Sequence, residues 1–69
     1  MIISYDQYRM ALETIHAHPA VRATVALYLR GEINEPPHEM RTLATIYRAA
    51  VPDDAEDALK IVERDWLAL

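Results

Sequence analysis

Apolar residues recur at helical spacing in four stretches of the chain, and capping residues or prolines bound each stretch. In the first stretch the apolar positions are Tyr5, Tyr8, Leu12 and Ile15. Their three- and four-residue steps are typical of one face of a helix. Ser4 and Gln7 have the types and the spacing of a capping box, which predicts that this helix begins at about Tyr5. Pro19 predicts an end or a kink near His18, and leaves open whether the next helix continues as one bent rod.

The second and third stretches are separated by a polar loop that contains two prolines. We expect the second helix over residues 19–30, with Gly31 supplying a left-handed stop, and the third over residues 37–50, with Pro52 closing it. The residues expected to be buried in the second helix are Val21, Val25, Tyr28 and Leu29. Those expected to be buried in the third are Met40, Leu43, Ala44, Tyr47 and Val51. No strand-like alternation competes with this pattern.

The fourth stretch has the broadest apolar face. Asp53 is expected to cap this helix, with Glu56 as the second half of a capping box. Its stripe includes Leu59, Val62, Trp66 and Leu69. One short helix in a monomer does not need so wide a face, so we expect these four residues to hold together both the core and a dimer. The pattern predicts an all-α fold, a single domain over residues 1–69 built as a compact bundle of three or four short helices.

Chain length points to the same assembly. The protein has 69 residues, 52% of them hydrophobic, but no Phe and no Cys. A core this small is near the lower limit for independent folding, and without disulfides the usual substitute is a second copy, so a homodimer is expected. The sequence shows neither an apolar run long enough to span a membrane nor a basic leader, which favours a folded, soluble, cytoplasmic protein with no membrane partner.

The negative charge is concentrated in the last part of the chain. Acids and arginines balance up to Pro52, so residues 53–69 account for the whole net charge of −4. The densest run is Asp53, Asp54, Glu56 and Asp57. Such a run repels nucleic acid and can attract a basic protein surface, although helix capping and solubility are the commoner explanation of a run of this kind. Arg22 and Tyr47 are further candidate contacts with a protein partner, with solvated charge and core packing as their ordinary alternatives.

Residues for catalysis, metal binding or nucleotide binding are scarce. His16, His18 and His38 lack the spacing of metal ligands, Ser4 is the sole serine, and a single glycine cannot form a phosphate-binding loop. We therefore expect no enzyme activity, no metal and no cofactor. An alternative is a small phage or plasmid transcription regulator that binds DNA through a helix-turn-helix at Gly31. Pro36 and Pro37 would then interrupt the recognition helix, which argues against it.

From Met1-Ile2-Ile3-Ser4-Tyr5, through the Pro36-Pro37 loop, to the acidic residues 53–57, the chain resembles the small anti-quorum-sensing proteins (anti-activators) encoded by temperate phages. The resemblance is one of length, helical layout and charge over all 69 residues, with no diagnostic motif. It implies a helical dimer in the host bacterium that binds the DNA-binding domain of a LuxR-type quorum-sensing transcription activator and blocks DNA binding. It also implies a second target, the assembly ATPase of the type IV pilus.

Overall fold

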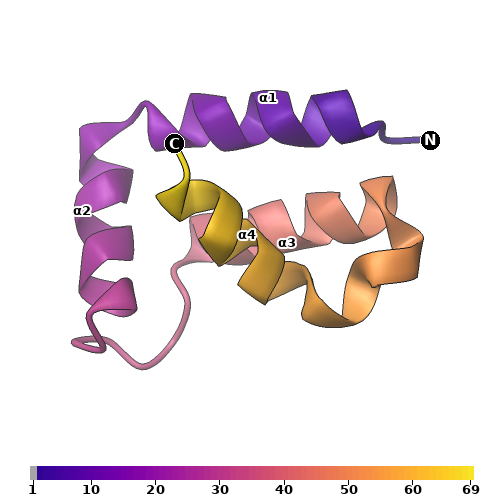
Figure 1. The fold of residues 1–69 in the computed structure, drawn as a ribbon. Helices are drawn as coiled ribbons and strands as arrows, with labels where there is room; N and C mark the ends of the chain where they lie inside the picture. The colour runs from indigo at the N-terminus through magenta and orange to yellow at the C-terminus, as the bar shows by residue number, and fades with distance from the viewer. Residues whose placement is uncertain (1) are drawn as a thin grey trace.

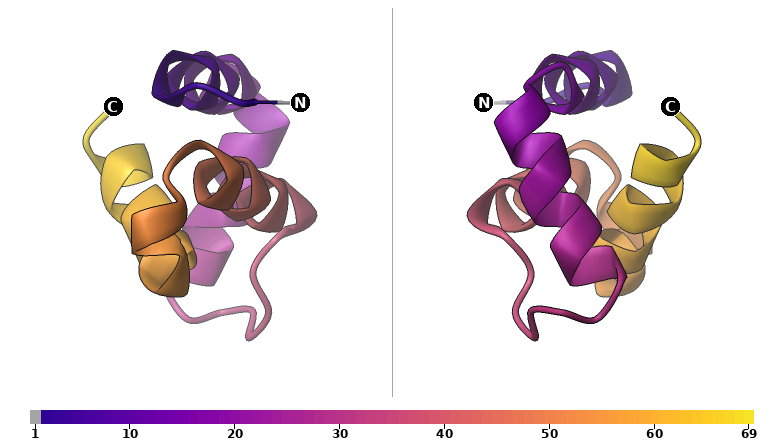
Figure 2. Two further views of the ribbon diagram at one scale, coloured as in Figure 1. Left: turned by 90° about the vertical axis from the view of Figure 1, so that its right-hand side faces the viewer. Right: turned by 90° about the vertical axis from the view of Figure 1, so that its left-hand side faces the viewer.

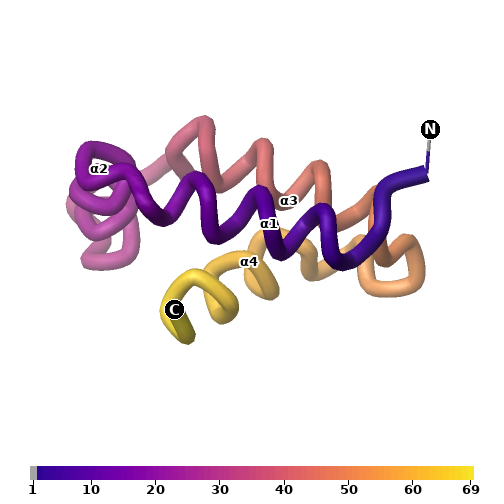
Figure 3. Tube along the Cα trace, turned by 90° about the horizontal axis from the view of Figure 1, so that it is seen from above, coloured from indigo at the N-terminus to yellow at the C-terminus, as the bar shows by residue number. Residues whose placement is uncertain are grey.

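The computed structural model describes residues 2–69, which form four α-helices and one short 3-10 helix and contain no strand. The elements in chain order are α1 (Tyr5–His16), α2 (Pro19–Leu29), α3 (His38–Ala50), η1 (Pro52–Asp57) and α4 (Ala58–Leu67). Helices α1 and α3 run side by side in opposite directions, α4 packs beside them, and α2 stands across one end (Figures 1 to 3). The prediction of an all-helical fold is confirmed.

Local signals place most helix ends close to where the sequence predicts them. The capping box forms as expected, because the Gln7 amide donates to Ser4 Oγ at 3.2 Å and the Ser4 amide donates to Gln7 Oε1 at 2.8 Å. Gly31 has a φ of 80°, a left-handed conformation that ends α2 and that favours glycine. Pro37 lies one position before α3 instead of opening it, and α2 ends at Leu29.

The question left open by Pro19 is resolved in favour of two separate helices. The chain turns sharply between α1 and α2 (Figure 1). Pro19 occupies the first turn of α2, where its missing amide costs nothing. The Arg22 guanidinium donates from Nη1 to the His16 carbonyl oxygen at 2.6 Å, which satisfies one of the unpaired carbonyls at the end of α1.

The core lies between α1, α3 and α4, and α2 covers one side of it. Its buried residues are Tyr8, Leu12, Val25, Met40, Leu43, Ala44, Tyr47, Ala58, Val62 and Trp66. The rings of Tyr8 and Tyr47 meet edge-on with their centroids 5.0 Å apart, so they join α1 to α3. Helix α3 contributes four buried side chains, whereas α2 contributes only Val25.

The last helix differs from its prediction at both ends. It begins at Ala58, not at Asp53, because the backbone of Asp54 is non-helical (φ −111°, ψ 22°) and residues 52–57 form η1 instead. Asp57 occupies the N-cap position without a capping hydrogen bond from its side chain. Val62 and Trp66 lie in the core as expected, and Leu59 packs against it half-buried. Leu69 does not belong to the core, since 45% of it is exposed beyond the end of α4.

Candidate protein-contact surface

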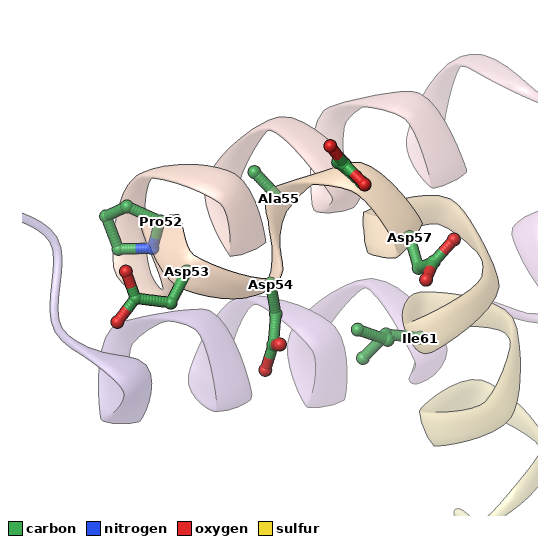
Figure 4. Close-up of a pocket in the computed structure, with 7 residues that line it drawn as sticks. Pro52, Asp53, Asp54, Ala55, Asp57 and Ile61 are labelled. Carbon is green, nitrogen blue, oxygen red and sulfur yellow. The ribbon is translucent and has the colours of Figure 1, made fainter.

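The acidic run forms one exposed turn between α3 and α4. We call residues 53–57 the acidic segment; its four carboxylate residues, Asp53, Asp54, Glu56 and Asp57, are all exposed. Figure 4 shows the side chains of Asp53, Asp54 and Asp57 pointing in different directions from η1. A cation needs convergent oxygen ligands, and no group of three or more potential ligands forms within residues 2–69. The arrangement suits contact with several separate cationic groups instead.

Contacts with α3 hold the acidic segment in place. The Arg48 guanidinium donates from Nε to the Ala55 carbonyl oxygen at 3.3 Å, and the Tyr47 hydroxyl donates to Asp54 Oδ2 at 3.5 Å. Burial raises the pKa of the Tyr47 hydroxyl, and the charge of Asp54 raises it further. Ala55 is half-buried, so η1 is anchored through its middle while its carboxylates remain in solvent.

The carboxylates of the acidic segment are not neutralised by the chain itself. The ion pairs found among residues 2–69 are Arg9–Asp65, Arg30–Glu32 and Arg64–Asp65. All three lie outside the segment, so its negative charge remains available to a partner. The segment also borders a hollow of about 260 Å³, with Ile61 as a half-buried apolar residue in its wall. A partner could therefore meet carboxylates and a small apolar contact in one place.

Two of the predicted contact residues do not join this surface. The structure corrects the prediction that Tyr47 contacts a partner. This residue is only 5% exposed and packs edge-on against Tyr8, so it belongs to the core. Arg22 is exposed, but it lies on α2, at the opposite end of the molecule from η1 (Figure 1). Its guanidinium already bonds to the end of α1, so the structure gives it a local role apart from the acidic segment.

Sequence reasoning overlooked one charged residue of structural importance. Asp65 is 8% exposed, and its Oδ2 accepts from the Tyr8 hydroxyl at 2.8 Å. Arg64 lies 3.2 Å from its other oxygen, and Arg9 lies 3.8 Å from Oδ2. Asp65 lies three residues after Val62 and next to Trp66, which puts it on the apolar face of α4. This position in the sequence could have indicated that the acid is buried. The acid therefore joins α1 to α4.

Comparison with known proteins gives this chain no family. No family model matches it, and neither a curated protein nor a solved structure does. Within residues 2–69, no helix has both the length and the apolar character required to cross a bilayer. A functional proposal therefore depends on the acidic segment and on the sequence resemblance.

Proposed function

We propose that this protein is a non-enzymatic inhibitor that acts by protein contact. Its acidic segment binds the basic face of the DNA-binding domain of a LuxR-type transcription activator and so prevents that domain from binding DNA. The observation that carries the proposal is the set of four exposed carboxylates within five residues, none of them in an ion pair with an arginine of the described chain. The resemblance to phage anti-activators supplies the class of target.

The charge of the segment fits such a target. A DNA-binding domain displays lysines and arginines where DNA phosphates dock, and these residues dominate its affinity for DNA. Carboxylates fixed on a short helix can bind the same lysines and arginines. The net charge of −4 also attracts the protein toward a basic target and so speeds their association. Charge of this kind sets the association rate and the choice of partner, while apolar contacts such as Ile61 add affinity.

The rest of the proposal follows the resemblance. The inhibitor acts as a homodimer in the cytoplasm of the bacterial host, without a cofactor and without binding nucleic acid itself. The assembly ATPase of the type IV pilus is its second target. The α3-anchored position of η1 supports a role in binding, because a segment that is fixed before binding loses little conformational entropy in a complex.

A gel-shift competition tests the proposal. Labelled promoter DNA is bound to the activator's DNA-binding domain, and the protein is titrated in; we expect it to release the DNA. The double variant Asp53→Lys with Asp57→Lys should compete at least about tenfold more weakly, because two attractions become repulsions. The matched control, Glu32→Lys with Glu35→Lys, changes the net charge equally in an exposed loop and should compete like the wild type.

Two results would contradict the proposal. Equal competition by the two double variants would show that the acidic segment does not bind the target. Salt-sensitive binding of the protein itself to random duplex DNA would support the alternative, a DNA-binding regulator, because non-specific DNA affinity depends on displaced counterions. Far-UV circular dichroism of each variant establishes that it is folded.

A further inference from the structure

A second hollow lies between α3 and α4, and its charged lining residues are basic, not acidic. This cleft has a volume of about 350 Å³ and is lined by Pro36, Arg41, Ala44, Thr45, Arg48 and Leu59. Ala44 is buried, while Pro36 and Leu59 are half-buried, so the floor is apolar. The two arginines stand at its rim, seven residues apart on α3. Within residues 2–69 neither arginine forms an ion pair, and Arg48 uses only Nε, on the Ala55 carbonyl.

The outer face of α1 carries the opposite pattern. Asp6, Met10 and Glu13 are all exposed, and we call these three residues the α1 ridge. Met10 is 66% exposed, which makes it one of the most exposed large apolar side chains of the structure. The carboxylates of Asp6 and Glu13 are absent from the ion pairs of the described residues. The ridge is thus an apolar side chain between two acids, and the cleft is an apolar floor between two arginines.

The spacing of the two surfaces also matches. Seven residues of helix correspond to about 10.5 Å along the axis, so Asp6 and Glu13 are separated by the same rise as Arg41 and Arg48. If α1 lies antiparallel on α3, Asp6 faces Arg48 and Glu13 faces Arg41. In that register Met10, four residues after Asp6, lies opposite Ala44, four residues before Arg48. The exposed methionine then enters the cleft at its buried floor residue.

The α1 ridge cannot reach the cleft of its own chain. Tyr8 and Leu12 are the buried residues of α1, and Tyr8 packs on Tyr47 of α3. Met10 is two positions from each of them and therefore points away from α3. From the matching charge and spacing, we propose that the cleft binds the α1 ridge of a second copy of this protein. The contact joins two different faces of the molecule, so a closed dimer forms when the two copies exchange it, with each α1 ridge in the cleft of the other copy.

This contact leaves the acidic segment free. None of the carboxylate residues of the acidic segment lines the cleft or belongs to the α1 ridge. The proposal specifies how copies associate, and it stands or falls separately from the proposed binding to an activator. Arginine is well suited to such a rim, because its planar guanidinium can form two parallel hydrogen bonds with one carboxylate.

Sedimentation velocity over a range of protein concentrations tests the contact with a charge swap. The wild type should associate as its concentration rises. Reversing the cleft (Arg41→Glu with Arg48→Glu) or the ridge (Asp6→Lys with Glu13→Lys) should weaken association at least about tenfold, because attraction becomes repulsion. Combining all four substitutions restores opposite charges across the contact, and association should return. The control Asp53→Lys with Asp57→Lys shifts the net charge as the ridge variant does and should leave association unchanged.

Several outcomes would overturn the proposal. A wild type that stays monomeric at every concentration would do so, and so would association that neither reversal weakens. Failure of the four-substitution variant to recover would do the same, provided that circular dichroism shows it folded. A fifth variant, Met10→Lys, tests the apolar part of the contact. Met10 is exposed in the single chain, so its replacement should weaken association without lowering the thermal stability of the monomer.

Discussion

The buried link between α1 and α4 can be tested by removing a single oxygen atom. Tyr8→Phe deletes the hydroxyl that donates to Asp65 Oδ2 at 2.8 Å, while the ring keeps its edge-on contact with Tyr47 at 5.0 Å. Asp65 is only 8% exposed, so water cannot readily replace the lost donor. The substitution therefore isolates the cost of leaving a carboxylate oxygen short of a hydrogen bond.

The expected loss of unfolding free energy is about 2 kcal/mol. A hydrogen bond to a charged group contributes about 1.5–3 kcal/mol. Arg64 at 3.2 Å and Arg9 at 3.8 Å remain beside Asp65 and partly compensate, which keeps the expected loss below the upper end of that range. For a domain of this size such a loss corresponds to a fall in melting temperature of about 8–16 °C.

Urea denaturation followed by circular dichroism at 222 nm measures this loss. The midpoint should fall while the slope with urea stays the same, because the surface exposed on unfolding is unchanged. Tyr5→Phe is the matched control: Tyr5 is 47% exposed, and its change should alter the free energy of unfolding by less than about 0.5 kcal/mol. Equal midpoints for Tyr8→Phe and the wild type would refute the reasoning. A double-mutant cycle with Asp65→Asn should give a coupling free energy of about 1 kcal/mol or more.

Two further predictions concern the core. Trp66→Ala removes a ring that is only 6% exposed, so it should cost about 3–5 kcal/mol and unfold most of the protein, as thermal denaturation would show; an unchanged melting temperature would contradict this burial. Burial, and next the hydrogen bond to Asp65, raise the pKa of Tyr8 above its usual 10.0. The folded state then holds this proton more tightly than the unfolded state, so stability is fully present below pH 10 and falls as the pH rises above it. Denaturation midpoints measured across this range should decline less steeply for Tyr8→Phe.

The sequence could predict the parts of the fold that depend on near neighbours. The Ser4 capping box, Pro19 and Gly31 act within a few residues, and the structure confirms each of them. The predicted start of the last helix, at Asp53, was wrong because local residue types do not show which contacts a segment makes with a neighbouring helix. Asp53 and Glu56 have the types of a capping box, but contacts from Tyr47 and Arg48 accompany a 3-10 turn instead.

Contacts between distant residues were beyond such reasoning. The Tyr8–Asp65 hydrogen bond joins positions 57 residues apart, so no local pattern could pair them. The hydrophobic pattern did predict that Tyr47 is buried, because this residue lies on the apolar stripe of its helix. Its burial excludes it from the candidate contact surface. The acidic segment was found from charge alone, because exposed carboxylates need no partner within the chain.

The thin attachment of α2 makes the domain unevenly stable. Only Val25 of this helix is fully buried, and the helix is bordered by Pro19 on one side and by the loop that follows Gly31 on the other. Detaching it uncovers fewer fully buried side chains than separating α1, α3 and α4, so we expect local unfolding at α2 to require less free energy than global unfolding. We therefore expect the backbone amides of α2 to exchange with solvent before those of α1, α3 and α4, and a protease to cut α2 first.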